Sequence, residues 1–387
     1  MNRSSPSAWL NALATAAPDH DIHQPFIDWA TPRLADERVR AVFARMAARS
    51  GIAHRWSVLP PTAAGGSPVA PGGFYDFPGL PPTSARMAAY AEYAPDLAMQ
   101  AIEALGDAFD PARITHIVAA SCTGFVAPGI DQILARRLNL APTVERVLIG
   151  FMGCYAGITA LRTARHIVRS QPDAVVLVVS VELSTLHLSL ADAPEPLLAM
   201  LQFSDGAAAG IVSAQAGGLK LGEGISLALE DSAELIRWDI GDKGFEMHLS
   251  GEVPGRLRET LSAPDVQRIL FGDMDASALL AVHAGGRSVL DAVEHALGVP
   301  PEALADSRAV LARFGNMSSA TILFVLAEMM ARGAAGEGIA IAFGPGLAAE
   351  AIRFTSNGAD IFPGESRGPE AGADHGPRLS PGNKRSE

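Results

Sequence analysis

The chain has 387 residues, a formal net charge of −12 and 48% hydrophobic residues. A chain of this size can bury a large core, either in two or three domains or in one large duplicated fold. The excess of acidic residues argues against nucleic acid or an anionic membrane as the main partner. The two cysteines, Cys122 and Cys154, are too few for a disulfide framework or a cysteine-rich zinc site. We therefore expect a cytoplasmic protein, and no apolar stretch approaches the ~20 residues of a membrane span.

The first predicted elements are a strand and a basic helix. Residues 8–17 end in small residues like a signal peptide, but Asn11 and Thr15 interrupt the apolar run, so we interpret the segment as a mature strand. A helix is predicted over residues 32–49, where several arginines give a basic face that could be simply solvated. Its expected apolar stripe is Val39, Val42, Phe43 and Met46.

The middle of the chain repeats a strand, turn and helix pattern. A Pro- and Gly-rich loop over residues 60–83 precedes a helix over 84–109. Strand-turn-helix units follow at 114–131 and 147–169, then strands at 174–184 and 203–212, short antiparallel pieces at 217–255, a third unit at 278–291 and a strand at 338–343. The composition beyond residue 356 predicts a disordered tail over 356–387.

The unit at 147–169 presents Cys154 at its turn, directly after Gly153. The apolar run before the turn predicts a buried strand. A thiol at the N-terminus of a helix lies in the positive end of the helix dipole, where its pKa can fall and the nucleophilic thiolate becomes accessible. The alternative is a small packed residue, because unpaired cysteine is often buried.

Two nearly equal spacings indicate an internal duplication. The pairs Gly153-Cys154 and Gly315-Asn316 lie 162 positions apart, and Asp131 and Asp291 lie 160 apart. Open α/β sheets place ligands at strand ends, so the turns of both halves should converge on one site.

The convergence would bring together the turns at Cys122-Thr123, Cys154, His283 and Asn316. A nucleophilic thiol needs a base or an imidazolium partner, and a developing enolate needs hydrogen-bond donors. Taken singly, His283 fits a structural histidine and Asn316 a helix cap. Their joint placement at equivalent turns favours a catalytic site.

Four motifs carry a family resemblance: Gly153-Cys154-Tyr-Ala-Gly, His283-Ala-Gly-Gly, Gly315-Asn316-Met-Ser-Ser and Phe343-Gly-Pro-Gly-Leu347. In this order and at these separations the chain resembles a type III polyketide synthase of the chalcone synthase-like family over residues 14–354. The Cys-His-Asn set alone also fits a ketoacyl synthase of the acyl-carrier-protein type. The Gly-Pro-Gly strand end and the Phe203-Ser-Asp-Gly motif favour the polyketide synthase.

The resemblance implies an α/β fold of the thiolase type, layered α/β/α/β/α and internally duplicated, usually in a homodimer. Residues 1–215 would form the half that carries the cysteine, and 216–355 the half that carries the histidine and asparagine. It also implies malonyl-CoA and a starter acyl-CoA as substrates, with neither a metal nor a redox cofactor.

Residue roles follow from the same resemblance. Cys154 would accept the starter acyl group, His283 would support the thiolate, and His283 with Asn316 would stabilise the enolate formed when malonyl-CoA loses carbon dioxide. Phe203 matches a gatekeeper phenylalanine between the CoA tunnel and the cavity. Arg45 and Arg49 match basic positions that contact CoA.

The chain also departs from the plant pattern. Met247 occupies the second gatekeeper position, Val42 stands where a phosphate-contacting lysine is usual, with Arg38 or Arg40 as substitutes, and Ala127 replaces a methionine at the dimer boundary. The expected substrate-binding residues are Phe203, Met247, Cys122, Thr123, Ser184, His187, Trp238, Ser318, Gly285 and Gly286. Cys122 is interpreted first as a small packed residue and second as a group that steers the polyketide.

These departures resemble bacterial members more than chalcone synthases. The leading hypothesis is a synthase that extends a fatty acyl-CoA starter and cyclises it to an alkylresorcinol or alkylpyrone. Alternatives are an aromatic or malonyl starter, giving chalcone- or tetrahydroxynaphthalene-type products, a ketoacyl synthase, an acyl-CoA thioesterase or acyltransferase, and a catalytically silent scaffold.

Overall fold

The computed structural model describes residues 6–76, 79–274, 277–358 and 362–363. Within these ranges the main sheet runs in the order β11-β12-β13-β8-β1-β7-β6-β4-β5, and β14 pairs with β1. Its strands are β1 (Ala8–Ala16), β4 (His116–Ser121), β5 (Glu145–Gly150), β6 (Val176–Leu183), β7 (Asp205–Ser213), β8 (Leu219–Leu227), β11 (Leu279–Val282), β12 (Ala335–Gly344), β13 (Ala348–Asn357) and β14 (Phe362–Pro363). Two short ladders, β2 (His20–Asp21) with β3 (Trp56–Ser57) and β9 (Ile236–Gly241) with β10 (Gly244–Leu249), lie outside it.

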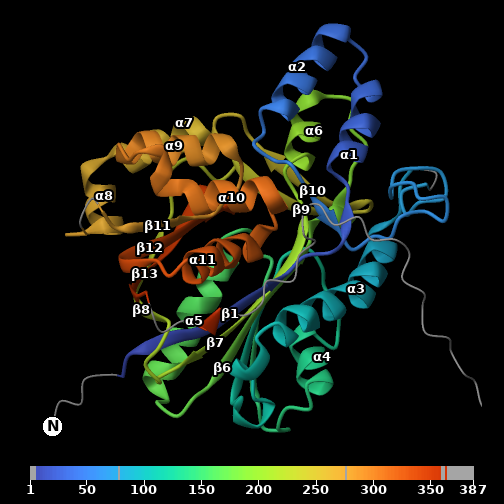
Figure 1. Ribbon diagram of the computed structural model, residues 1–387. Coiled ribbons are helices and arrows are strands. Elements are labelled where there is room, and N and C mark those ends of the chain that lie inside the picture. Colours follow the sequence, from blue (N-terminus) through green and yellow to red (C-terminus); the bar gives the residue numbers. More distant parts are fainter. Residues whose placement is uncertain (1–5, 77–78, 275–276, 359–361, 364–387) are drawn as a thin grey trace, which may run out of the picture.

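Helices cover the sheet from several sides (Figure 1). They are α1 (His23–Ala30), α2 (Glu37–Ala48), α3 (Thr83–Glu103), α4 (Ile130–Arg137), α5 (Ala156–Ser170), α6 (Pro194–Met200), α7 (Val253–Ser262), α8 (Pro264–Phe271), α9 (Arg287–Leu297), α10 (Ala305–Phe314) and α11 (Thr321–Ala331). Within the described ranges, no helix combines the length and the apolar character needed to cross a membrane.

The first arm of the sheet, β1, β7, β6, β4 and β5, separates two sets of helices. Successive residues of a strand face opposite sides. In β4, Val118 packs in the cluster of α5 and α11, whereas Ile117 packs in the cluster of α3 and α4. Val178 and Val179 of β6 divide in the same way. The first arm is therefore a layer with α3 and α4 outside and α5 and α11 inside.

The second arm, β8, β13, β12 and β11, lies on the other side of α5 and α11. In β12, Ala340 and Ala342 belong to the cluster of these two helices. Ile339 and Ile341 point the other way, into the cluster of α7, α9 and α10. The expected α/β/α/β/α layering is confirmed, with the two arms joined where β8 pairs with β1.

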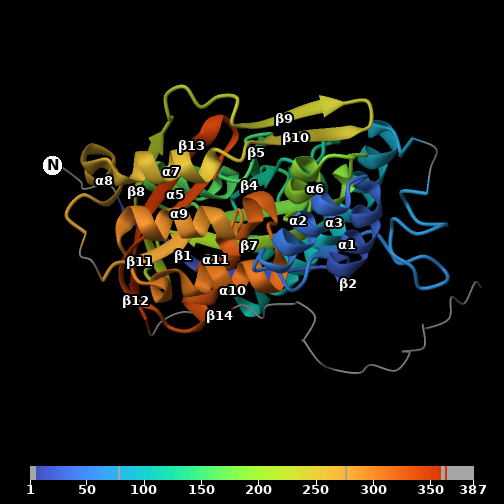
Figure 2. The same cartoon turned by 90° about the horizontal axis from the view of Figure 1, so that it is seen from above.

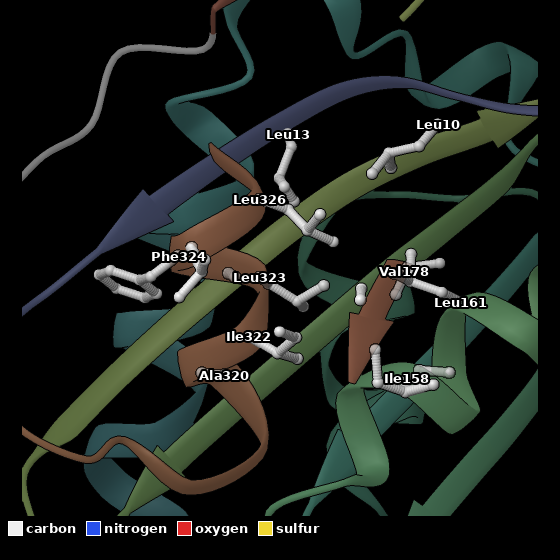
Figure 3. Close-up of a cluster of buried hydrophobic side chains, with 14 of the residues drawn as sticks. Leu10, Leu13, Ile158, Leu161, Val178, Ala320, Ile322, Leu323, Phe324 and Leu326 are labelled. Atoms are coloured by element: carbon white, nitrogen blue, oxygen red, sulfur yellow. The ribbon is translucent and has the colours of Figure 1, made fainter. Parts of the chain in front are cut away.

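The innermost layer is the most apolar part of the molecule. Figure 3 shows Ile158 and Leu161 of α5 near Ile322 and Leu323 of α11, with strand residues of the first arm packed around them. The two helices approach closely at Gly157, where a Cβ would lie 2.3 Å from the carbonyl oxygen of Ser319. Only glycine permits this approach.

The strand orders of the two arms confirm the predicted duplication. From β1 outward, β7 is antiparallel to β1, β6 is antiparallel to β7, and β4 is parallel to β6. From β8 outward, β13, β12 and β11 repeat this antiparallel, antiparallel, parallel sequence. Gly153 and Gly315, which precede α5 and α11, have φ angles of +82° and +68°.

Several predicted boundaries need correction. The basic helix begins at Glu37, after a separate 3-10 turn at Thr31–Arg33, because Asp36 caps it by accepting a hydrogen bond from the amide of Arg38. Its apolar stripe is narrower than expected: Phe43 is fully buried, but Val42 and Met46 are exposed. Helix α3 ends at Glu103, well before residue 109.

The strand before Cys154 is also not buried within the chain. In β5, Val147 and Leu148 are 39% and 45% exposed, because β5 is the edge of the first arm. At the C-terminus, β13 continues to Asn357, so the start of the predicted tail at residue 356 is wrong. Apart from 356–358 and the β14 pair, the tail lies outside the described residues.

Candidate active site

A sharp turn between β5 and α5 presents Cys154. Gly153 has φ +82°, and a Cβ there would lie 2.3 Å from Cδ of Pro345. The glycine is therefore required both by the left-handed backbone and by the contact with the Gly-Pro-Gly loop after β12. Cys154 is half-buried, two residues before the first residue of α5.

Burial sets the resting state of the thiol. Desolvation raises the pKa of Cys154 to about 11, although hydrogen bonds with Ser318 and Asn316 lower it. The expected fall of this pKa through the helix dipole is wrong for the free protein, because desolvation is the larger effect. At neutral pH the thiol of Cys154 is therefore protonated.

His283 lies at the end of β11, where its amide donates to the carbonyl oxygen of Ile341 at 2.8 Å. The ring is 1% exposed, and burial lowers the pKa of His283 to about 3. Neither ring nitrogen has a hydrogen-bond partner among the described residues. A neutral imidazole with both nitrogens unpartnered can accept a proton from one group and donate to another.

The side chain of Asn316 is held in one orientation. Its Nδ2 donates to the carbonyl oxygen of Gly285 at 3.2 Å, and its Oδ1 accepts from the amide of Ser318 at 2.8 Å. An amide nitrogen has two hydrogens, and the second N–H of Asn316 is directed at the sulfur of Cys154. Asn316 also forms a parallel bridge with Phe203, whose position is thereby tied to it.

Three pockets meet at Phe203 and Met247, which line all of them. The entrance pocket, of about 1220 Å3 including the part open to solvent, contains Cys154, His283 and Asn316. The inner pocket, of about 350 Å3, continues from Cys154. The side pocket, of about 780 Å3, extends toward α1 and α6.

Most predicted substrate-binding residues lie in these pockets. The inner pocket is lined by Cys122, Thr123, Ser184, Trp238 and Ser318, the side pocket by Ser184, His187 and Trp238, and the entrance pocket by Gly285. Gly286 lines none of them; a Cβ there would lie 2.0 Å from Oε1 of Gln202, so it serves the packing of the loop before α9. Trp238 comes from the β9–β10 hairpin, which Figure 2 shows along one edge of the molecule.

Two of the predicted pocket residues are engaged in the protein's own hydrogen bonds. Nε2 of His187 donates to the carbonyl oxygen of Thr123 at 2.7 Å. Its Nδ1 accepts a hydrogen bond of 3.0 Å from the amide of Phe245. Only its ring face is available to a ligand. The sulfur of Cys122 accepts from the amide of Gly153 at 2.9 Å and is 2% exposed. This hydrogen bond and the burial of the residue both favour the interpretation of Cys122 as a packed structural residue.

Glu182 is a buried residue of the site that the sequence patterns did not indicate. Its carboxylate accepts hydrogen bonds from the amide of Cys122 at 2.9 Å, the hydroxyl of Thr123 at 2.8 Å and the hydroxyl of Ser319. It therefore joins the turn after β4 to the turn before α11. A glutamate inside the apolar strand β6 is the only sequence signal that could have found it.

The two basic residues predicted to bind CoA lie on α2 and just after it. Arg45 and Arg49 are exposed and flank Met46, which lines the entrance pocket. Arg287 donates to the carbonyl oxygen of Arg49 at 3.0 Å. Arg40, suggested as a substitute for the missing lysine at position 42, is occupied by the carbonyl oxygens of Leu34 and Ala35.

Two family models match nearly the whole chain. The N-terminal domain of chalcone and stilbene synthases matches residues 1–216, and the C-terminal domain matches residues 223–357. The chain belongs to the chalcone and stilbene synthase family. It is a type III polyketide synthase, a condensing acyltransferase of a family that uses acyl-CoA substrates.

Individual relatives agree with this assignment. The alpha-pyrone synthesis polyketide synthase-like Pks18 of Mycobacterium tuberculosis is 34% identical over 288 residues, covering 70% of this chain and 72% of that protein. Bisdemethoxycurcumin synthase of Oryza sativa subsp. japonica is 35% identical over 295 residues, covering 70% and 73%. The crystal structure of PKS-I from the brown alga Ectocarpus siliculosus superposes with a TM-score of 0.82 at 26% identity, over 92% of this chain and 100% of that chain. The polyketide synthase therefore shares the fold of solved type III enzymes.

Proposed function

We propose that this type III polyketide synthase loads an acyl-CoA starter on Cys154, extends it with malonyl-CoA and cyclises the product to an alkylresorcinol or alkylpyrone. The observation that carries the proposal is the entrance pocket, which Cys154, His283 and Asn316 line together. Cys154 and Asn316 precede α5 and α11, and His283 follows β11.

Loading begins with a proton transfer. His283 has unpartnered ring nitrogens and takes the proton of the Cys154 thiol. The thiolate attacks the thioester carbonyl of the starter, the acyl–sulfur bond to CoA breaks, and the CoA thiolate leaves with the proton that His283 returns. The acyl group is then a thioester of Cys154.

Extension needs donors for an enolate oxygen. When the malonyl thioester loses carbon dioxide, the electron pair of the broken bond passes into the enolate. Its oxygen accepts hydrogen bonds from His283 and from the N–H of Asn316 that points at Cys154 in the resting protein. The enolate carbon attacks the acyl thioester, a carbon–carbon bond forms and the Cys154 thiolate leaves. Cys154 then takes up the lengthened chain again.

The apolar side pocket supports a fatty acyl starter. Its lining includes Ile22, Phe26, Leu59 and Val69, side chains suited to an alkyl tail. The printed name of the mycobacterial relative, an alpha-pyrone synthesis polyketide synthase-like protein, points the same way. The rice relative named bisdemethoxycurcumin synthase keeps an aromatic starter as the alternative.

Substrate delivery and assembly are part of the proposal. Arg45 and Arg49 bind CoA phosphates beside the entrance pocket, because both are exposed cations with no ion-pair partner among the described residues. The protein forms a homodimer through β5, whose unpaired edge carries the exposed Val147 and Leu148. With its two free thiols the enzyme works in the reducing cytoplasm.

The test is incubation of the purified protein with malonyl-CoA and a panel of acyl-CoA starters, with products identified by mass spectrometry. Cyclised extension products of alkyl starters support the proposal. Free acid without extension favours a thioesterase, and neither turnover nor acylation of Cys154 favours a silent scaffold.

Two variants separate the proposed roles. Cys154→Ala should abolish starter loading, because the other cysteine, Cys122, does not line the entrance pocket. Asn316→Ala should leave loading intact and reduce malonyl decarboxylation by about 100-fold, as expected for loss of one enolate donor. Equal loss of both steps in Asn316→Ala would contradict this division.

A further inference from the structure

The side pocket contains polar groups that the proposed chemistry does not use. Most of its polar side chains are satisfied internally. Tyr75 donates to the carbonyl oxygen of Thr185, the hydroxyls of Ser57 and Thr185 lie 2.7 Å apart, and both nitrogens of His187 are occupied. Two lining residues differ: Nη2 of Arg55 and Oγ of Ser184 are buried and have no hydrogen-bond partner in the part of the chain that the structure describes.

Arg55 is a buried cation in the wall of the side pocket. It is 2% exposed, and its guanidinium carbon lies 4.7 Å from the ring centre of Phe26. Its Nη1 donates to the carbonyl oxygens of Phe203 at 2.8 Å and Met200 at 3.0 Å, and its Nε donates to Nδ1 of His23 at 3.2 Å. No ion pair within 4.0 Å neutralises it in the described part of the chain. An unpaired buried donor on a residue that lines a pocket can be satisfied by an acceptor atom of a bound ligand.

Ser184 lines two of the pockets. It is 7% exposed and lines both the inner pocket, which contains Cys154, and the side pocket, which contains Arg55. A chain attached to Cys154 that extends from the inner pocket into the side pocket therefore passes Ser184 and enters the space that Arg55 lines. Both residues offer hydrogen-bond donors, and Arg55 cannot accept.

We propose that Arg55 and Ser184 form a recognition site for oxygen acceptors, carboxylate or ketone, on the acyl chain that enters the side pocket. An oxygen of this kind replaces the missing partner of each donor, whereas a plain alkyl chain leaves the guanidinium unsatisfied. The acceptor comes either from the tail of the starter or from the ketones of the growing chain. This inference rests on the proposed function, because it requires an acyl group on Cys154.

The first experimental arm uses loading alone, without malonyl-CoA, so that only the starter can supply the oxygen. Straight-chain acyl-CoA thioesters and length-matched thioesters with a terminal carboxylate are compared for the rate of Cys154 acylation by intact-protein mass spectrometry. At the chain length that reaches Arg55, the carboxylate should load about tenfold faster than the alkyl thioester, the effect of one charged hydrogen bond. The second arm adds malonyl-CoA to a plain alkyl starter and records the number of extensions.

Arg55→Lys is the informative variant. Its ammonium still donates to the carbonyl oxygens of Met200 and Phe203 but lacks a second nitrogen for a ligand. Arg86→Lys is the matched control, since Arg86 is 0% exposed, donates Nη1 to two carbonyl oxygens and also has an unpartnered Nη2, but does not line the pocket. Ser184→Ala removes the other donor without disturbing the anchors of Arg55.

The proposal predicts that Arg55→Lys removes the tenfold preference for the carboxylate in the loading experiment or shortens the products in the extension experiment. Arg86→Lys should change neither result. If Arg55→Lys changes the loading preference, the oxygen belongs to the starter. If it changes only the product length in the extension experiment, the oxygen belongs to the growing chain. Unchanged selectivity and product length in both Arg55→Lys and Ser184→Ala would overturn the site, as would equal effects of Arg55→Lys and Arg86→Lys. If no thioester acylates wild-type Cys154, the proposed function itself fails.

Discussion

Replacing Glu182 with glutamine should flatten the pH dependence of the free energy of unfolding. Burial raises the pKa of Glu182 from 4.5 to about 7, although hydrogen bonds from Ser319, Cys122 and Thr123 lower it. Glutamine is nearly isosteric, and an amide oxygen can still accept from the amide of Cys122 and the hydroxyl of Thr123. The substitution therefore removes the titration while it keeps most of the contacts.

The direction follows from where the proton is held. Below about pH 4.5 the carboxyl is protonated in both states, so its contribution is constant. As the pH rises toward 7 the unfolded chain releases the proton while the folded protein keeps it, and the stability falls. The difference between the two pKa values corresponds to about 3 kcal/mol, which is fully lost above about pH 7.

The measurement is equilibrium denaturation by urea of wild type and Glu182→Gln at several pH values between about 4 and 8. The free-energy difference between the two should move by about 3 kcal/mol in favour of the variant across this range. The comparison cancels Asp205, whose pKa burial also raises to about 7. A difference that stays constant with pH would refute the reasoning.

Four further outcomes are expected. Gly153→Ala should prevent acyl-enzyme formation, read by intact mass, because a Cβ there would lie 2.3 Å from the ring of Pro345. Replacing Arg45 and Arg49 together with alanine should raise KM for acyl-CoA about tenfold, while N-acetylcysteamine thioesters, which lack phosphates, react as before. Leu148→Asp should convert the proposed dimer to monomers in sedimentation velocity, because it places a charge on the exposed edge of β5. Leu326→Ala, in the fully packed inner layer, should lower the free energy of unfolding by about 2–4 kcal/mol, measured by denaturant titration.

The layered fold and the convergence of the site could be predicted because both depend on long-range periodicity. Apolar runs that end in small residues predict strands followed by turns. The constant spacing between the pairs Gly153-Cys154 and Gly315-Asn316 predicts that these two turns are equivalent. Both glycines have positive φ angles in the structure. Such patterns survive in the sequence because backbone geometry permits few substitutions.

Other features depend on neighbours that a local pattern does not contain. The run at Val147 and Leu148 has the composition of a buried strand, yet it lies exposed at the edge of the first arm, because strand order depends on distant segments and is not contained in a local apolar run. The resting pKa of Cys154 depends on desolvation by distant segments, which outweighs the helix terminus. The hydrogen bonds that occupy His187 come from Thr123 and Phe245, far apart in the chain.

The position of β1 has a consequence for synthesis of the chain. β1 is made before its partners, which are residues 207–213 of β7, 219–221 of β8 and the short β14. Roughly 200 further residues must therefore leave the ribosome before either arm can be completed, and closing such a long loop slows folding. During that interval the α3 and α4 layer can collapse only on an unfinished sheet. We therefore expect nascent chains that end before β8 to bind chaperones that hold exposed apolar strands, and chains in which β8 has paired with β1 to be released.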